Sequence, residues 1–390
     1  MTSYSESTIQ AKVNKTELAT LGAKLFNVDC KVFKDWYWQQ RNLIYNYEGI
    51  HKIIHLNDYE KKSFEQHCPK LNFGVSPYYL TLIKYLDNTF QDSLPLRRQF
   101  FPDMKELEDS IGIDDPLEEE AHSPVKEVVH LYPDRVAFCV ALICSSYCRY
   151  CFRKRRTSED GLHFNRKILK NGLDYIRSNP SIKDVLLTGG DPFVASDKAI
   201  ENLLIELKKI PHVELIRFGT KTPVTMPYRS TPALAKIISK YHPVWINTHF
   251  NCEEELTTEA KESLKILADH GIPLGNQSVL LKGVNDSSEK ILKLCKELVK
   301  NRVRPYYLFY PHLIKGTKHL RVDYRLGADI IKKMRGNISG YAIPQYILDT
   351  PSGKVPVSHN YILQEDGNDL LMEDLRGEIW REKDAILNSL

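Results

Sequence analysis

Long hydrophobic runs and a strong excess of one charge are both missing from this sequence. No stretch reaches the length of about 18 apolar residues that a membrane-spanning helix needs, and the opening residues, MTSYSESTIQAKVNKTEL, lack the apolar centre of a signal peptide. The 54 basic and 50 acidic residues leave a net charge of +4, which indicates neither nucleic acid nor a membrane surface as a partner. We therefore expect a cytoplasmic protein with no nucleic-acid or membrane partner.

Cysteine is also scarce, with 8 among 390 residues, and most of these cysteines stand alone. Scattered single cysteines are not typical of a secreted disulfide framework, which supports a reducing environment. The exception is one cluster, Cys144-x3-Cys148-x2-Cys151, which the basic run RKRR follows almost at once. Three cysteines so close together are unexpected in a chain this poor in cysteine and indicate a metal site.

Three thiolates are one short of a tetrahedral zinc site or a four-cysteine iron–sulfur cluster. Either a fourth ligand comes from elsewhere in the chain, or one metal corner is left open. A structural zinc knuckle usually offers a second CxxC or a nearby CxxH pair, and the sequence has neither. The spacing therefore favours a [4Fe–4S] cluster whose open iron binds a small molecule, with structural zinc as the alternative.

The chain divides into three regions. Residues 1–120 are predicted to be mostly helical, and the acidic, turn-rich stretch DDPLEEEAHSPV marks the boundary. Residues 121–345 then alternate short apolar runs with helical patterns, and residues 346–390 form a C-terminal segment. The apolar runs are VAFCVALI (136–143), DVLLT (184–188), ELIRFG (214–219), VWINTHF (244–250), QSVLL (277–281) and RPYYLFY (304–310).

Helical periodicity fills the gaps between these runs. In DKAIENLLIELKKI the apolar residues follow one helix face, as they do in EELTTEAKESLKILADHG, where Gly271 suits a C-terminal cap. Strand–helix units at intervals of about 30 to 45 residues imply a parallel α/β sheet, either barrel-like or doubly wound. The loop after the first strand carries the cysteine cluster instead of a GxGxxG motif, at the strand end where α/β barrels keep their chemistry.

These motifs, taken in order, resemble the lysine 2,3-aminomutase family of radical S-adenosylmethionine (SAM) enzymes. The cysteine spacing is similar to the cluster motif of the superfamily. From about residue 30 to 360 the similar segments include SPYYLTLI, YPDRV, CSSYCRYCFRKR, LTGGDPFVASD, NTHFN, GIPLGNQSVLLKGVND and DTPSGKVPV. The resemblance implies a partial (β/α)6 TIM-like radical SAM barrel over residues 121–345, and a pyridoxal 5′-phosphate (PLP) lysine in the C-terminal segment.

The resemblance also assigns residues to the cluster and to SAM. Cys144, Cys148 and Cys151 would hold three irons of a [4Fe–4S] cluster. A GGD motif would receive the amino group of SAM, because paired glycines allow close backbone approach and a carboxylate suits an ammonium group. Polar residues at later strand ends would surround the adenosine and methionine parts. The SAM-binding set is Gly189, Gly190, Asp191, Asn247, His249 and Gln277.

For PLP, the resemblance implies that Lys354, in the segment ILDTPSGKVPV, bonds the cofactor covalently and acts as the catalytic lysine. The loop before it is two residues shorter than is usual in the family. Arg135 of YPDRV resembles an arginine that binds the PLP phosphate. The family commonly has a second arginine four positions earlier, where this chain has Leu131, so part of the phosphate site is missing or is supplied by another residue.

The substrate-binding residues would be Arg153, Asp349 and His312. Arg153 matches an arginine that binds the α-carboxylate of the substrate. Lysine-specific relatives place two aspartates around the side-chain ammonium; here Asp349 is kept and His312 replaces the other. Because a neutral imidazole supplies little charge, this pair is a weaker ammonium site, and we expect a cationic substrate, lysine first and arginine second.

The resemblance implies an isomerase. A reduced cluster cleaves SAM to a radical that removes hydrogen from the β-carbon of the substrate, and PLP carries the amino nitrogen as it moves to that carbon. An external electron donor such as flavodoxin or ferredoxin would reduce the cluster. We expect no zinc, because Ser287 stands where clostridial-type relatives have a zinc-binding cysteine after GVND. Homo-oligomerisation remains open.

Three alternatives remain. The first is an aminomutase acting on glutamate or another non-cationic amino acid, although such members carry a lysine and an asparagine at the two substrate positions. The second is the related aminomutase that supports β-lysylation of a translation factor, which is shorter at its N-terminus. The third is a structural zinc or iron–sulfur protein with no catalytic role.

Overall fold

The computed structural model describes residues 17–67, 72–90, 93–158, 166–366, 369–374 and 377–382. Its centre is a nine-stranded sheet whose strands lie side by side in chain order. Neighbours from β2 to β8 are parallel, and an antiparallel strand flanks them at each edge. The strands are β1 (Val128–Tyr132), β2 (Arg135–Ala141), β3 (Asp184–Gly189), β4 (Leu215–Gly219), β5 (Val244–Thr248), β6 (Leu274–Val279), β7 (Val303–Phe309), β8 (Gln345–Thr350) and β9 (Gly353–Pro356).

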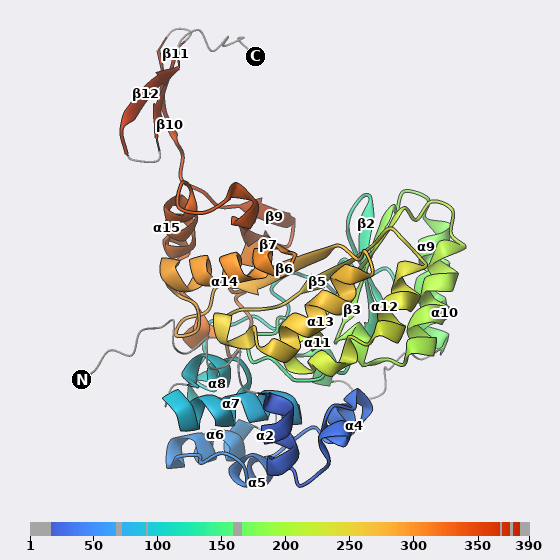
Figure 1. Ribbon diagram of the computed structural model, residues 1–390. Helices are drawn as coiled ribbons and strands as arrows, with labels where there is room; N and C mark the ends of the chain where they lie inside the picture. The colour runs from blue at the N-terminus through green and yellow to red at the C-terminus, as the bar shows by residue number, and fades with distance from the viewer. Residues whose placement is uncertain are drawn as a thin grey trace, which may run out of the picture.

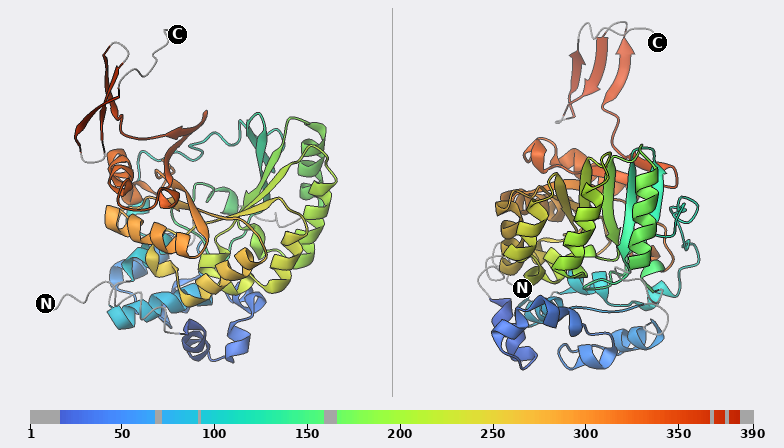
Figure 2. Two further views of the ribbon diagram at one scale, coloured as in Figure 1. Left: turned by 45° about the horizontal axis from the view of Figure 1, so that its top comes forward. Right: turned by 90° about the vertical axis from the view of Figure 1, so that its right-hand side faces the viewer.

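A parallel sheet wound in one direction is a barrel wall and not a doubly wound sheet, whose strand order reverses. Figure 2 shows the strong curvature of this wall, with helices on its convex side. The predicted partial barrel is confirmed, and its six predicted strands correspond to β2–β7. The structure adds a seventh parallel strand, β8, so the C-terminal segment enters the sheet at its start.

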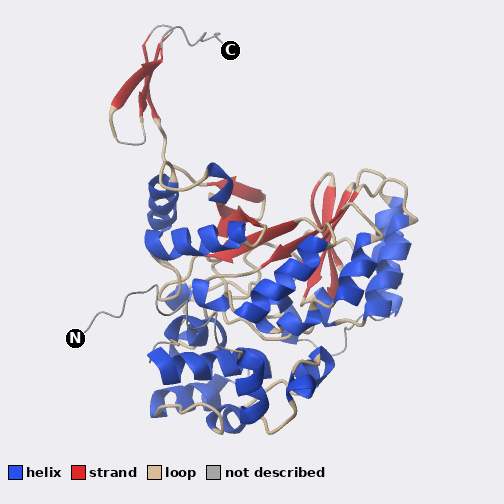
Figure 3. Ribbon diagram, viewed as in Figure 1, coloured by secondary structure: helices blue, strands red, loops and turns tan. Residues whose placement is uncertain are grey.

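Helices cover the outer face of the barrel wall, as Figures 1 and 3 show. They are α9 (Arg166–Ser178), α10 (Asp197–Lys208), α12 (Pro232–Ser239), α13 (Thr258–Asp269), α14 (Ser288–Lys300) and α15 (Tyr324–Met334), with a short α11 (Thr222–Thr225) after β4. The predicted helix α10 begins where the Ser196 side chain accepts a hydrogen bond from the Ala199 N–H. Its apolar face is buried, and Gly271 follows α13 with φ +75°, as a C-terminal cap requires.

The two edge strands of the sheet meet and nearly close the barrel. The Tyr132 hydroxyl, at the end of β1, accepts a hydrogen bond of 2.8 Å from the Lys354 N–H in β9. The His122 Nε2 lies 3.1 Å from the Pro351 carbonyl oxygen. Gly353 has φ +127°, and a Cβ there would lie 3.0 Å from the Tyr132 hydroxyl, so a residue with a side chain would strain this contact.

The N-terminal region is helical, as predicted, and forms a layer against one end of the barrel (Figure 1). Its helices are α2 (Leu18–Leu25), α3 (Cys30–Phe33), α4 (Trp36–Arg41), α5 (Tyr47–His51), α6 (Asp58–His67), α7 (Pro77–Phe90) and α8 (Leu94–Phe100). The buried Tyr79 hydroxyl of α7 donates to Glu255, which follows β5, at 3.0 Å. Ser76, just before α7, donates to the Thr225 carbonyl after β4. The layer therefore covers the C-terminal ends of the barrel strands.

After the barrel, the chain forms a small three-stranded antiparallel sheet of β10 (Ile362–Asp366), β11 (Asp369–Glu373) and β12 (Ile379–Glu382). It projects from the barrel in every view of Figures 1 and 2. In the part of the chain that the structure describes, no helix combines the length and the apolar character needed to cross a membrane.

Candidate active site

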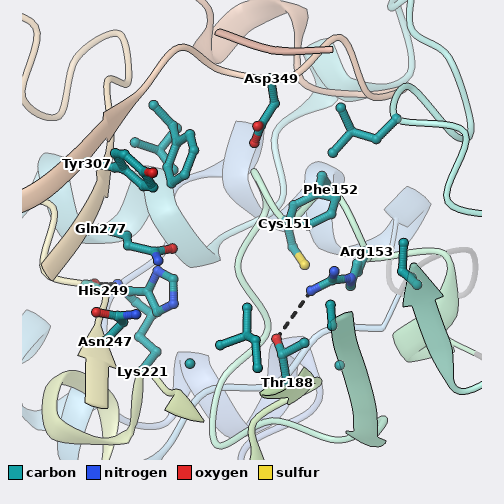
Figure 4. Close-up of a pocket in the computed structure, with 18 of the residues that line it drawn as sticks. Cys151, Phe152, Arg153, Thr188, Lys221, Asn247, His249, Gln277, Tyr307 and Asp349 are labelled. Atoms are coloured by element: carbon teal, nitrogen blue, oxygen red, sulfur yellow. Dashed lines mark hydrogen bonds between the residues drawn. The ribbon is translucent and has the colours of Figure 1, made fainter. Parts of the chain in front are cut away.

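A cavity of about 790 Å³ occupies the interior of the barrel, within the range of small-molecule sites. All the residues predicted for the site line it: Arg135, Cys144, Cys148, Cys151, Arg153, Gly189, Gly190, Asp191, Asn247, His249, Gln277, His312, Asp349 and Lys354. Figure 4 shows side chains from opposite walls facing one open space, with Cys151, Arg153 and Asp349 across from His249, Gln277 and Tyr307. Residues separated by more than 200 positions therefore belong to one site.

The three clustered thiols lie on the loop that follows β2. Burial raises the pKa of each thiol, to about 12 for Cys148, and the neighbouring thiols raise the pKa of Cys144 further. Such thiols stay protonated unless a cation binds to them, and an iron–sulfur cluster supplies that positive charge. Among the described residues no group of three or more His, Cys, Asp or Glu side chains is close enough to hold a single metal ion. A [4Fe–4S] cluster binds each thiolate through a different iron and so suits a wider spacing.

The N-terminal layer anchors the loop that carries these cysteines. The Tyr147 N–H donates to the Gly74 carbonyl at 2.9 Å, and the Arg149 N–H donates to the Gln99 carbonyl at 2.8 Å. The Arg149 guanidinium also forms a buried, two-pronged ion pair with Glu106, with Nε 2.9 Å from Oε1. These contacts fix the loop between the barrel and the helices, and they cover it from solvent.

The GGD motif makes a tight turn directly beside the cysteine loop. A Cβ on Gly190 would lie 2.3 Å from the Ile143 carbonyl oxygen, so only glycine allows this approach. The Asp191 carboxylate is buried and accepts four hydrogen bonds: from the Thr220 hydroxyl, and from the N–H groups of Phe193, Lys221 and Thr222. Because a carboxylate has about four acceptor positions, these four bonds occupy Asp191 and hold the turn in place.

The residues predicted to surround SAM come from β5 and β6. Asn247 is buried against Gly275, where a Cβ would lie 2.4 Å from its Oδ1. Burial and the nearby Lys221 ammonium lower the pKa of His249 to about 4, so its imidazole is neutral at pH 7. Lys221 itself donates to the His249 carbonyl at 2.6 Å and lies 3.4 Å from Glu255. No motif pointed to Lys221, although its position just after β4 is one where barrels carry functional residues.

Arg153 forms a buried ion pair with Glu119 that the sequence did not reveal. Both oxygens of Glu119 contact it, with Nε–Oε1 at 3.0 Å, Nε–Oε2 at 3.1 Å and Nη2–Oε1 at 2.6 Å. Its Nη1 donates to the Thr188 hydroxyl at 3.2 Å, the dashed line in Figure 4. Burial alone would lower the pKa of Arg153, but the Glu119 carboxylate raises it above its ordinary value. Glu119 belongs to the acidic stretch before the barrel, which also supplies Glu120 to Arg155 at 2.7 Å.

Lys354, Asp349 and His312 form one row of polar contacts in the cavity. The Lys354 Nζ lies 2.9 Å from Asp349 Oδ1, across the β8–β9 pairing, and His312 Nε2 lies 3.2 Å from Asp349 Oδ2. Burial would raise the pKa of Asp349, but His312 and Lys354 lower it, so the carboxyl group is ionised at neutral pH. Phe152 packs beside His312 with ring centres 4.9 Å apart.

Arg135 lines the same cavity from the start of β2. Its guanidinium stacks on the Tyr132 ring, 3.7 Å from the ring centre, and its Nη1 lies 2.8 Å from Asp134 Oδ1. This ion pair is solvent-exposed, and such pairs exchange partners at little cost. Leu131 also lines the cavity and adds no charge. The amine of Lys354 and the guanidinium of Arg135 thus fit the aldehyde and the phosphate of PLP, respectively.

Comparison with known proteins gives concordant results. A family model described as the radical SAM superfamily matches residues 139–295, and one described as lysine-2,3-aminomutase matches residues 331–384. The chain is 42% identical over 352 residues to the L-lysine 2,3-aminomutase of Clostridium subterminale, which covers 89% of this chain and 83% of that protein. It is 39% identical to the L-lysine 2,3-aminomutase of Bacillus subtilis, over 89% and 74% of the two chains. It is also 37% identical to the glutamate 2,3-aminomutase of Clostridioides difficile, over 96% and 88%.

Proposed function

Because the chain belongs to the lysine 2,3-aminomutase family of radical SAM enzymes, and is thus an isomerase, we propose that it moves the amino group of a free L-α-amino acid from C2 to C3. One observation carries the proposal: the thiols of Cys144, Cys148 and Cys151 and the amine of Lys354 line the same cavity. A metal-cluster site and an amine that can bond an aldehyde face one space, as a reaction that needs both requires.

The residues of the cavity fit three cofactors. The cysteine thiols would hold a [4Fe–4S] cluster, and Lys354 and Arg135 would bind PLP. SAM would be bound by the turn of Gly189, Gly190 and Asp191 together with Asn247, His249 and Gln277. When bound, the reduced cluster and SAM supply a radical that abstracts hydrogen, and PLP carries the migrating nitrogen. The chain contributes binding, orientation and exclusion of water, the last through the N-terminal helices that cover the cysteine loop.

Arg153 would bind the α-carboxylate of the substrate. Glu119 fixes the plane of its guanidinium and occupies the Nε edge, while the Nη1 group points to the Thr188 hydroxyl at the end of β3. A guanidinium that is already oriented loses little conformational freedom when it binds a carboxylate. Thr188 and Arg153 together would then offer hydrogen bonds to the substrate beside Cys151.

The substrate would be a cationic amino acid, lysine first and arginine second. Asp349 is ionised, and the Lys354 amine cannot serve both Asp349 and a cofactor aldehyde. Cofactor binding therefore frees one carboxylate oxygen for a cation on the substrate side chain, while His312 keeps the other oxygen. A substrate carboxylate at this position would be repelled, which disfavours glutamate, the substrate named for the Clostridioides difficile relative.

The remaining roles follow from the chemistry. A small electron carrier such as flavodoxin or ferredoxin would reduce the cluster in the cytoplasm, where the amino acid pool lies, and the enzyme would contain no zinc. The β-lysylation type of lysine aminomutase is the second candidate, because it has the same reaction and cofactors. An assembly of identical chains is compatible with this function.

A product screen tests the proposal. The anaerobically reconstituted enzyme, with dithionite as reductant, is incubated with each of the twenty amino acids, and mass spectrometry looks for isomers of unchanged mass and altered retention. We expect a β-isomer from lysine, from arginine or from both. A β-isomer from glutamate or a neutral amino acid alone would overturn the cationic substrate but keep the aminomutase. No isomer from any amino acid, with intact cluster and PLP, would overturn the proposed function.

A further inference from the structure

Strand β7 contains a bulge that turns two adjacent tyrosines toward the cavity. Pairing with β6 runs from Asn276 opposite Pro305 to Gln277 opposite Tyr307, so Tyr306 is an extra residue in β7. Neighbouring residues in a regular strand point to opposite faces, and a bulge reverses this alternation. The rings of Tyr306 and Tyr307 consequently stack with centres 3.7 Å apart, and both line the cavity.

The two phenols form a directed pair of hydrogen-bond donors. The Tyr306 hydroxyl donates to the Tyr307 oxygen at 2.8 Å. Within the described part of the chain, the Tyr307 hydroxyl proton has no acceptor, so it can be donated to a ligand. Burial and the contact with Tyr306 raise the pKa of Tyr307 above its ordinary value, so this phenol stays protonated at neutral pH. Figure 4 shows Tyr307 on the cavity wall.

The pair lies near the proposed phosphate-binding arginine. Phe309 connects Tyr307 with Lys354: the Tyr307 and Phe309 ring centres lie 5.3 Å apart, and the Lys354 Nζ lies 5.6 Å from the Phe309 ring centre. Tyr132 in turn stacks on Arg135 and accepts the Lys354 N–H. Lys354, Arg135 and the two bulged phenols therefore gather around one part of the cavity.

We propose that Tyr307, supported by Tyr306, donates a hydrogen bond to the phosphate of PLP. The phenol would thus supply a donor to the phosphate, which the Leu131 side chain cannot supply. This inference rests on the PLP dependence of the proposed function. A phosphate dianion accepts hydrogen bonds at three oxygens, so one guanidinium leaves acceptor positions open. A neutral donor that is already polarised by a second hydroxyl group can fill one of them without adding charge.

The test compares two forms of the cofactor. Full-length protein freed of PLP is titrated by equilibrium dialysis with PLP and with pyridoxal, which has the same ring and aldehyde but no phosphate. In Tyr307→Phe we expect the Kd for PLP to rise about tenfold to a hundredfold, as for loss of a hydrogen bond to a charged group, with the Kd for pyridoxal unchanged. The ³¹P resonance of bound PLP should also shift.

Controls separate this role from a general effect on the fold. Tyr310→Phe changes a β7-adjacent tyrosine that packs on Arg321 outside the cavity, and it should alter neither Kd. Leu131→Arg added to Tyr307→Phe should restore PLP binding, because it supplies a charged donor from β1. Restoration would support the inference even if Tyr307→Phe were slightly destabilised.

Three results would contradict the inference. An unchanged PLP affinity in Tyr307→Phe overturns it, as does an equal loss of PLP and pyridoxal affinity, which would indicate a structural role. If Arg304→Gln weakened the affinity for PLP but not for pyridoxal, while Tyr307→Phe bound both as the wild type does, the phosphate would be assigned to another cavity residue. Failure of the wild-type protein to bind either PLP or pyridoxal would instead overturn the PLP dependence itself.

Discussion

At the residue scale, the charged groups of the cavity are held by partners from distant parts of the chain. Glu119 holds Arg153, and four donors from two loops hold Asp191. The sequence could identify Arg153 and Asp191, because each stands beside a strand end in a recognisable motif. It could not predict their partners, because those contacts depend on how separate loops meet in the folded barrel. The sequence therefore predicted residues that line one cavity, but not the hydrogen bonds that hold them.

The buried pair of Glu119 and Arg153 predicts a loss of stability in Glu119→Gln. The substitution leaves the Arg153 charge buried without its counterion, which typically costs about 3 kcal/mol of the free energy of unfolding. Urea unfolding of the cofactor-free protein measures the effect. Glu120→Gln is the matched control: its ion pair with Arg155 is exposed, so we expect a change below about 0.5 kcal/mol. Equal effects from the two variants would contradict the structural role of Glu119.

Asp349 gives a second prediction at this scale. Asp349→Ala removes the carboxylate that would bind a cationic side chain, so turnover of lysine or arginine should fall at least a hundredfold, while the cluster still cleaves SAM without substrate. Asp329→Ala, which breaks an exposed pair with His359, is the control and should leave turnover unchanged. If Asp349→Ala retained full activity on its cationic substrate, the proposed side-chain contact would be wrong.

At the scale of elements, the strands and helices of the barrel were largely predictable, and two features were not. Helices α10 and α13 followed from apolar periodicity, and the end of α13 followed from Gly271. Strand β8 was not separated from the C-terminal segment, because the run QYILDT is short and the β9 hairpin follows it directly. The bulge at Tyr306 could not be predicted, because a shift of one residue is set by pairing with β6 and not by the sequence of β7.

The cysteine loop leads to a prediction of the metal content of the protein. Anaerobically purified protein should contain about 4 Fe per chain and be brown, and Cys148→Ala should lose both the iron and the colour while remaining folded. Cys139→Ala is the control, because Cys139 is buried in β2 and is not a predicted ligand. Iron analysis and visible absorbance measure the result. Colourless protein containing zinc, unaffected by Cys148→Ala, would exclude the radical mechanism.

At the scale of the whole molecule, the barrel, the N-terminal layer and the C-terminal sheet are joined to very different extents. Hydrogen bonds and a buried ion pair join the N-terminal layer to the cysteine loop. The C-terminal sheet exposes most of its residues, including Trp380, and contacts α15 through the ion pair of Lys332 and Glu373. Composition and helical pattern predicted the N-terminal layer, but no pattern in the sequence predicted the projecting C-terminal sheet.

This contrast predicts that the C-terminal sheet is dispensable for the cavity. A chain that ends after Asn360 keeps β8, β9 and every residue predicted for the site. We expect it to retain its iron and its PLP affinity within about a factor of two, because the described residues of β10 and β12 are exposed to solvent. Removal of residues 1–75 should by contrast abolish the cluster, since it deletes the Gly74 partner of the cysteine loop. Iron and PLP analysis of both truncated chains decides between these outcomes.

The junction of β1 and β9 has a consequence for how small molecules enter and leave the cavity. Backbone hydrogen bonds join all the neighbouring strands from β1 to β9. The junction between β1 and β9 depends instead on the hydrogen bonds of Tyr132 with Lys354 and of His122 with Pro351. Because side-chain hydrogen bonds are fewer here than the bonds of a backbone ladder, we expect the wall to separate at this junction first. Such an opening would carry Lys354 with it. Entry of an amino acid at this junction would then be coupled to the position of Lys354, the residue proposed to bind PLP.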